Sequence, residues 1–345
     1  MQLHHRARRG LVAVAVAAAT AFAAAPAAVA DDADPGLGRA FSQVEPGVPG
    51  GTVEDDGAQA LAAATVLADA DWAYFQAVNV ARIDAGVEPA SRNPRLNAIA
   101  AAWATKQAAS GGLSTDPSLE SKLPAGWSDG YQAIYAGPAT SAAEAIRVVA
   151  RDYLPADTTY PTTTDVGVAV AEVPGPDGVN WYTIYQVSAR YSHSSPQAGE
   201  STLYRFYRPS SGTHFYSTSK RERNSVIRDT GFRYEGPVAY VLKPTSTASG
   251  SRDLNRFYQP GTGTHFYTST TREYRTVKTL PQYRLDGVTG KVYTTAGTGR
   301  TAMYRFYRPA SGTHFYTASA SERDSVKQLP GYTYEGIAFY LRKAS

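Results

Sequence analysis

The sequence predicts an α+β N-terminal domain followed by a β-rich C-terminal domain with pseudo-threefold symmetry. Apolar residues recur at helical spacing up to about residue 153 and then alternate as in strands. A Thr-His-Phe-Tyr motif occurs three times in the C-terminal part, with histidine spacings of 51 and 49 residues. The net charge also differs between the two parts of the chain. Residues 31–202 hold 9 basic and 21 acidic side chains, near −12, whereas residues 203–345 hold 22 and 9, near +13.

The first thirty residues predict an export signal. A basic head precedes an apolar run from Leu11, and small residues at Ala28 to Ala30 suit cleavage. The run is too short for a membrane span, and no second hydrophobic segment follows. The absence of cysteine excludes disulfides and thiolate metal sites. We therefore expect a secreted protein, extracellular or associated with the cell wall, whose residues 31–57 form a flexible leader.

Residues 58–191 predict three helices and two strands. The first helix lies in "DADWAYFQAVNVARIDAG". The second has Asn93 as its cap and Pro94 at its first position, and it ends at Gly111. The third lies in "TSAAEAIRVVARDYL". The strands "DVGVAVAEV" and "VNWYTIYQVSARY" follow, joined by the turn signal "PGPDG".

The helical motifs "N..R...G..P" and "L...A..WA...A", followed by "GLS", resemble the CAP superfamily, the cysteine-rich secretory, antigen 5 and pathogenesis-related 1 group, in its bacterial secreted form. The matching residues are Asn79, Arg82, Gly86, Pro89, Leu96, Ala100, Trp103, Ala104 and Ala108. The resemblance runs from about Ala68 to Tyr191. It implies an α-β-α sandwich.

The resemblance also implies where a site should be, because many CAP domains have a cavity with two histidines and two acidic residues that can bind a divalent metal. This sequence has Thr115 in place of one histidine and Gln132 in place of a glutamate, and "LPADTTYPTTTD" replaces the step with the other histidine. Residues 31–192 contain no histidine, so this domain cannot build a histidine metal site or a histidine base from its own residues.

A carboxylate pair is the remaining candidate for chemistry in this domain. Glu144 and Asp152 lie two turns apart in the third predicted helix, and a solvated surface role is favoured over acid/base catalysis. No nucleophile elbow, zinc-protease motif or phosphate loop occurs. We therefore predict no catalytic residues, no metal and no cofactor.

A polar linker at 192–202 leads to a three-repeat module at 203–345, with repeats near 203–243, 254–295 and 303–342. Each repeat is expected to form two strands, a short helix and a hairpin bent at Glu235 and Gly236 or their counterparts. A unit of this size cannot bury its aromatic residues alone, so three should close together, in a β-trefoil-like arrangement or a small propeller. The module resembles a repeat of unknown function, "RFY.P..GTHFYT", found in triplicate in bacterial secreted proteins.

The second repeat departs most from this pattern. It has Gln259 for the arginine after the first strand, Leu285 for a tyrosine and Asp286 for a glutamate.

The recurring polar residues of the module are the candidate ligand-binding set. Three interpretations compete for the histidines: a structural role, which is favoured, one peripheral ligand pocket in each repeat, or convergence on a metal at the axis. The arginines are expected to pair with Glu235, Asp286 and Glu335. The hypothetical ligand-binding residues are His214, His265, His314, Tyr216, Tyr267, Tyr316, Arg205, Arg256 and Arg305.

Glutamates in the S/T-x-x-E pattern have a predicted structural role. The pattern occurs after the second strand of each repeat and predicts a capping box, in which Glu222, Glu273 or Glu322 reaches back to the amide of the cap residue.

These features favour a secreted, non-catalytic protein whose basic, aromatic module binds the cell envelope or a carbohydrate. The partner would be a cell-wall polymer or glycan, with no membrane span, and export argues against nucleic acid. A hydrolase acting on peptidoglycan or peptide is the alternative. A structural or interaction protein, whose acidic and basic parts attract one another, is a further one.

Overall fold

The computed structural model describes residues 18–23, 64–154, 162–175 and 179–344. The chain divides into two compact units, Met1–Tyr191 and Ser192–Ser345, which are described separately. The predicted leader at 31–57 and most of the predicted export signal lie outside the described residues. The exception is β1 (Ala18–Ala23), which pairs antiparallel with β4 of the N-terminal unit. The export signal stays a prediction.

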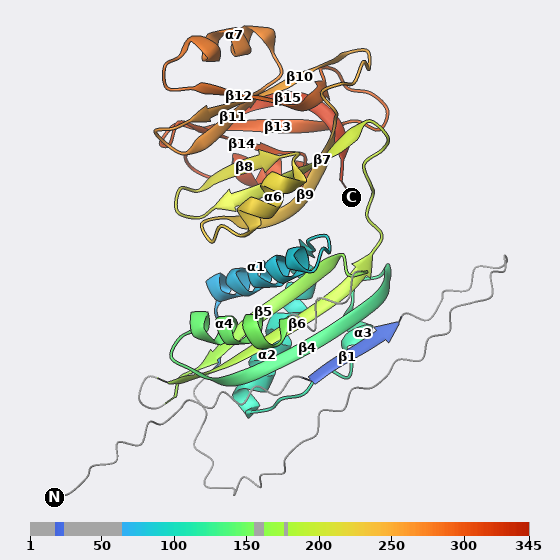
Figure 1. The fold of residues 1–345 in the computed structure, drawn as a ribbon, viewed down its shortest axis with the longest axis vertical. Coiled ribbons are helices and arrows are strands. Elements are labelled where there is room, and N and C mark those ends of the chain that lie inside the picture. The colour runs from blue at the N-terminus through green and yellow to red at the C-terminus, as the bar shows by residue number, and fades with distance from the viewer. Residues whose placement is uncertain (1–17, 24–63, 155–161, 176–178, 345) are drawn as a thin grey trace, which may run out of the picture. The chain divides into compact units, whose positions relative to one another are not determined.

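Three of the four helices described in the N-terminal unit lie in the predicted segments, and the short α3 was not predicted (Figure 1). They are α1 (Ala68–Asp84), α2 (Pro94–Ser110), the short α3 (Leu119–Lys122) and α4 (Ala142–Asp152). The side chain of Asn93 accepts the amides of Arg95 and Leu96 at the start of α2. Gly111 ends this helix in the left-handed conformation at φ 63°, which glycine adopts without steric cost.

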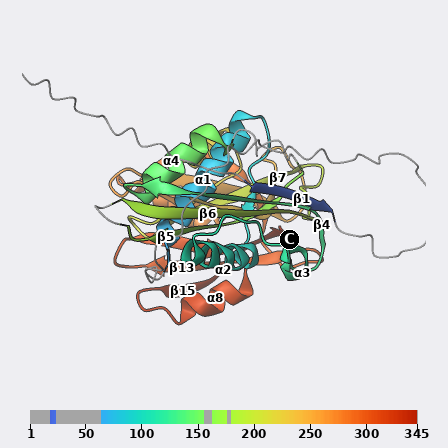
Figure 2. The ribbon, with the colours of Figure 1, turned by 90° about the horizontal axis from the view of Figure 1, so that it is seen from below.

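One sheet forms the middle layer of this unit, in the strand order β1-β4-β6-β5-β2, with β3 pairing parallel to β5. Its remaining strands are β2 (Thr65–Val66), β3 (Ser91–Arg92), β4 (Trp127–Ala139), β5 (Asp165–Val173) and β6 (Asn180–Tyr191). Helices α1 and α4 lie on one face of the sheet and α2 lies on the other (Figure 2). Part of the predicted turn between β5 and β6 lies outside the described residues.

Close packing joins α2 to the sheet. Leu96, Trp103 and Tyr185 are among the buried residues between them. A Cβ on Gly167 of β5 would lie 2.1 Å from the backbone carbonyl carbon of Leu96, so only glycine permits this approach.

Strand β4, the longest strand of the sheet, was not among the predicted elements. Its central residues are buried on both faces because helices cover both sides. Residues such as those of "YQAIYA" therefore lack the apolar–polar alternation that reveals a half-buried strand.

The C-terminal unit repeats the order strand, strand, helix, strand three times (Figure 1). The first repeat comprises β7 (Glu200–Arg208), β8 (Thr213–Ser217), α6 (Lys220–Ile227) and β9 (Arg233–Leu242). The second comprises β10 (Ser251–Gln259), β11 (Thr264–Thr268), α7 (Thr271–Thr279) and β12 (Arg284–Tyr293). The third comprises β13 (Thr301–Arg308), β14 (Thr313–Thr317), α8 (Ala320–Lys327) and β15 (Thr333–Lys343). Strand β7 begins inside the predicted linker.

The expected hairpin at the end of each repeat is wrong, because each repeat ends in one continuous strand. The register of β9 shifts opposite Leu203/Tyr204 and again opposite Arg205/Phe206. Gly236 has φ 98° beside these irregularities, so the bend predicted there is a bulge rather than a turn.

The first strand of each repeat lies between the other two, which gives three antiparallel three-stranded sheets. The ends of the third strands join these sheets: Lys291 pairs with Leu242, Tyr293 with Tyr340, and Arg342 with Tyr240. The trefoil-like or propeller-like closure stays a prediction. Among the helices of the described residues, none is long and apolar enough to span a bilayer.

Candidate functional site

Three tyrosines meet at the centre of the C-terminal unit. The rings of Tyr216, Tyr267 and Tyr316 pack edge to face, with centroids 5.5–5.8 Å apart, and each residue is 2% exposed. The Tyr267 hydroxyl donates to the carbonyl oxygen of Tyr216 at 2.6 Å and accepts the amide of Tyr216 at 3.0 Å. Tyr316 makes the same pair of bonds to Tyr267, and Tyr216 makes it to Tyr316.

This closed tyrosine ring bears on the interpretation that the three histidines bind a metal at the axis. The residues that converge at the centre are tyrosines, so the alternative in which the histidines converge on an axial metal is wrong. Within the described ranges, no group of three His, Cys, Asp or Glu side chains could hold a metal ion. The hydroxyls of the three tyrosines are engaged by backbone groups, and this interior position is where the structure places three of the candidate ligand-binding residues.

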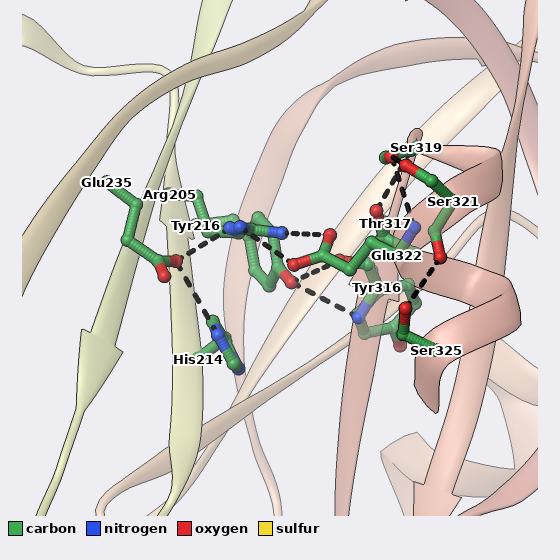
Figure 3. A network of polar contacts seen from close by, with 10 residues as sticks. All are labelled: Arg205, His214, Tyr216, Glu235, Tyr316, Thr317, Ser319, Ser321, Glu322 and Ser325. Carbon is green, nitrogen blue, oxygen red and sulfur yellow. Dashed lines mark hydrogen bonds and ion pairs between the residues drawn. The ribbon is translucent and has the colours of Figure 1, made fainter. Parts of the chain in front are cut away.

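The histidines lie instead at the three junctions between repeats. Figure 3 shows the junction between the third and first repeats. Arg205 binds Glu322 of α8 with two hydrogen bonds, of 2.7 and 3.1 Å, and its Nε lies 2.7 Å from Oε2 of Glu235. His214 packs on Phe315 of the third repeat, with ring centroids 4.7 Å apart, and its Nε2 lies 3.5 Å from the Glu235 carboxylate.

The other junctions repeat this arrangement. Arg256 binds Glu222 of the first repeat at 2.8 and 3.1 Å and lies 2.6 Å from Asp286. Arg305 donates to Glu273 of the second repeat at 3.0 Å and lies 2.7 Å from Glu335. The predicted pairing of each arginine with the carboxylate of its own repeat is confirmed.

His265 and His314 also occupy the position of His214. Their Nε2 atoms lie 3.6 Å from Asp286 and 3.4 Å from Glu335, and they pack on Phe215 and Phe266 of the preceding repeat.

The histidines are uncharged at neutral pH. Burial, reinforced by the neighbouring arginine, lowers the pKa of His214 to about 3 and the pKa values of His265 and His314 to about 4. Burial raises the pKa of Glu235 although Arg205 opposes the effect. Each junction therefore combines one arginine, two carboxyl groups and a neutral imidazole.

The capping prediction is correct in one half only. The hydroxyls of Ser219, Thr270 and Ser319 accept the amides of the glutamates three residues on. The glutamates do not bond the cap amides in return. Those amides donate to the hydroxyls of Ser217, Thr268 and Thr317, and the glutamates bind the arginine of the next repeat.

In the N-terminal unit, the position where the resemblance implied a glutamate is held by Gln132, whose side-chain amide has a structural role. Gln132 is 4% exposed. Its Oε1 accepts the amide of Asp116 at 2.8 Å and the hydroxyl of Tyr185, and its Nε2 donates to the Asp116 carbonyl oxygen at 3.1 Å. Asp116 in turn pairs with Lys122 at 2.5 Å. Gln132 thus holds the Asp116 loop and has no proton to exchange. The segment of "LPADTTYPTTTD" at residues 155–161 lies outside the described residues.

Glu144 and Asp152 both line a pocket of about 260 Å³ between α4 and the sheet. Hydrogen bonds from Thr140 lower the pKa of Glu144, and the hydrogen bond from Arg151 lowers the pKa of Asp152. A general acid needs the opposite shift, so these two groups are poor candidates for acid catalysis at neutral pH.

Sequence reasoning missed the buried carboxyl group of Asp71. It accepts the amide of Val170 at 2.6 Å and lies 3.9 Å from Arg92. Burial raises the pKa of Asp71 to about 6. No sequence signal marked it, because it lies in the first turn of α1, where acidic residues are common as favourable dipole partners.

Each of the two units contains a segment that matches a known family model. Residues 75–187 match the model of the Cysteine-rich secretory protein family (CAP), and residues 202–342 match a Domain of unknown function (DUF5648). The chain therefore contains a CAP domain with mixed α/β structure, followed by a DUF5648 domain of antiparallel sheets. The predicted resemblance to the CAP superfamily is confirmed. No curated protein and no solved structure matches the chain.

Proposed function

We propose that this is a secreted, non-catalytic protein that attaches to an anionic polymer or glycan of the cell envelope through its C-terminal unit. The observation that carries the proposal is the placement of charge in that unit. Six of the nine acidic residues at 203–345 belong to the junction clusters, where they are paired with only three of the 22 basic residues.

The surface outside the junctions is consequently more basic than the whole unit. Outside the clusters, residues 203–345 hold 19 basic side chains, of which only Arg223 is buried, and three acidic ones. Two of these acids, Asp253 and Asp324, already lie beside Lys291 and Arg323. A surface of this kind attracts polyanions over about 10 Å at 0.1 M salt. The acidic N-terminal part, near −12, would be repelled by the same polymer.

The hydrolase alternative has less support. The candidate carboxylates of the CAP domain have lowered pKa values, and the amide of Gln132 occupies the glutamate position. A structural role, in which the two parts attract one another by charge, stays an alternative prediction.

Co-sedimentation of the full chain with purified Gram-positive cell walls tests the proposal. We expect the protein to pellet with walls at 50 mM salt and to be released progressively toward 500 mM. Walls stripped of their anionic polymers should retain much less protein. A protein that stays in the supernatant at low salt, or binds stripped walls equally well, would contradict the proposal.

Surface variants distinguish a loss of wall binding caused by changed charge from one caused by unfolding. Arg252 and Arg284 are exposed, so Arg252→Glu with Arg284→Glu should weaken wall binding and leave thermal unfolding nearly unchanged. Asp253→Asn removes one negative charge from the same surface and should not weaken binding.

A further inference from the structure

An arginine crosses the junction between the third and first repeats. Arg308, at the end of β13, donates to the carbonyl oxygens of Ser211 at 3.1 Å and Gly212 at 3.4 Å, in the β7–β8 turn. Its Cζ lies 5.8 Å from the centroid of Tyr332, so the guanidinium group covers this ring. Here the arginine connects one repeat to the turn of the next.

A second arginine, Arg208, occupies the equivalent position between the first and second repeats. Arg208 has its Cζ 5.2 Å from the centroid of Phe232, which corresponds to Tyr332. Its Nη1 lies 3.0 Å from the place that a Cβ would take on Gly263, in the β10–β11 turn.

The junction between the second and third repeats lacks this arginine. Gln259 occupies the position, and its Oε1 accepts a hydrogen bond from Thr262 at 3.1 Å, within its own turn. On the third repeat, no non-neighbouring atom of the described structure lies within 4 Å of the place that a Cβ would take on Gly312. The bond of Arg305 to Glu273 here is also single, whereas Arg205 and Arg256 each bind with two. This junction therefore has fewer arginine contacts between its repeats than the other two.

A pocket of about 580 Å³ lies at this same junction. Phe266 and Tyr283 of the second repeat line it, and His314 of the third repeat closes it. Tyr283 corresponds to Phe232 and Tyr332, the rings that the arginines cover at the other junctions. The volume falls within the range of about 300–1,000 Å³ that is typical of small-ligand sites.

The polar groups of the pocket suit a hydroxyl-rich ligand with one negative charge. Thr270 and His314 offer neutral hydrogen-bonding groups, and Arg305 already neutralises Glu273. Arg272 is exposed on α7, lines the pocket and makes no ion pair in the part of the chain that the structure describes. A guanidinium group binds a carboxylate through two parallel hydrogen bonds, while aromatic rings pack against an apolar ring face.

We propose that the pocket between the second and third repeats binds a single saccharide residue that carries a carboxylate, and that Gln259 leaves this pocket open where an arginine would cross it. This inference deepens the proposed envelope attachment, on which it rests, by naming one site and one class of ligand. The partly exposed ring of Tyr283 packs against the sugar ring and Arg272 binds its carboxylate. The other two junctions serve to hold the repeats together.

Sugars in matched acidic and neutral pairs test the site in the full chain by isothermal titration calorimetry. We would compare N-acetylmuramic acid with N-acetylglucosamine, and galacturonic acid with galactose. We expect one bound sugar per chain and a preference for the acidic member of each pair, and the two pairs distinguish a wall amino sugar from a uronic acid. No binding of any of these sugars at millimolar concentration would overturn the proposal.

Two variants locate the binding. Gln259→Arg introduces the arginine of the other junctions and should abolish sugar binding while thermal stability is kept or raised. Arg272→Gln should weaken binding of the acidic sugar by about tenfold or more and leave the neutral sugar unaffected. Arg221→Gln, at the matching position of α6, removes the same charge far from the pocket and is the control. Equal losses in Arg221→Gln and Arg272→Gln, or undiminished binding in Gln259→Arg, would each overturn the proposal.

Wall binding by the same variants separates the two proposals. Gln259→Arg adds a positive charge, so it should still pellet with walls at low salt. Loss of sugar binding with retained wall binding supports the pocket. A wild-type chain that binds walls but none of the sugars overturns the pocket and leaves the envelope attachment standing.

Discussion

Replacing Tyr267 with phenylalanine removes one hydroxyl from the central tyrosine ring and should destabilise the whole C-terminal unit. That hydroxyl both donates to and accepts from the backbone of Tyr216, which lies in β8 at the edge of its sheet. The substitution leaves a buried N–H and a buried C=O without partners. Each such group costs about 1–3 kcal/mol. We expect a loss of about 3 kcal/mol in the free energy of unfolding, or roughly 6–12 °C in melting temperature for a unit of this size.

The four tryptophans of the chain provide an internal control, because all of them lie in the N-terminal unit. Tryptophan fluorescence therefore follows unfolding of that unit alone, while circular dichroism follows both units, so a shift seen only by circular dichroism belongs to the C-terminal unit. The tryptophan transition should not move in Tyr267→Phe. Tyr258→Phe is the control for removing a hydroxyl outside the ring: Tyr258 is half-buried, and its hydroxyl makes no hydrogen bond with other described residues. If both substitutions cost the same, the ring hydroxyls do not stabilise the unit as we argue.

Three further predictions concern pH, the CAP domain and the junctions. The junction histidines have pKa values of about 3–4 when folded and about 6.5 when unfolded, so the unfolded state binds more protons between pH 6.5 and 5. The C-terminal unit should lose up to about 4 kcal/mol per pH unit there, measured by urea unfolding. Asp71 acts oppositely, because its folded pKa is raised to about 6, so its contribution to N-terminal stability should grow as pH falls; parallel losses in both units would contradict this. Gln132→Glu should destabilise the CAP domain by about 3–5 kcal/mol at pH 7, because it buries a charge without a partner, and an unchanged tryptophan-detected midpoint would refute it. Ser319→Ala should cost about 1 kcal/mol as a lost cap. Glu322→Gln keeps the backbone cap but removes the charge that binds Arg205, so it should cost more by denaturant unfolding; the reverse order would show that the bond between Glu322 and Arg205 contributes less than the cap.

Local signals predicted the helices well, and non-local contacts account for the failures. Asn93 and Gly111 fix the ends of α2 through bonds to the adjacent backbone, which the sequence displays directly. Strand β4 was missed because burial on both faces erases alternation. The glutamate of each capping pattern was assigned to its own helix, whereas Glu322 and its counterparts bind arginines more than 30 residues away in sequence.

The sequence predicted which residues belong to the candidate site but not where each of them lies in the fold. Histidine and tyrosine alternate two apart in each repeat, and nothing in the pattern says which of His214 or Tyr216 reaches the centre. Gln259 was visible as a departure from the repeat. The consequence of Gln259 is that, in the described part of the chain, no arginine of the second repeat reaches the turn of the third. This depends on a contact between repeats and is visible only in the structure.

The cyclic order of the tyrosine bonds also limits how this domain can evolve or be engineered. Each repeat supplies one hydroxyl to a neighbour and receives one from the other neighbour. All three rings also contact one another edge to face, so the circuit is complete at three members. An open solenoid can lengthen or shorten by one unit without disturbing the rest. Here a fourth copy has no place in the circuit, and a two-copy fragment leaves an edge strand without its donor. The same closure means that circular permutation leaves the two neighbours of each repeat unchanged, so new chain ends placed between any two repeats should preserve the circuit.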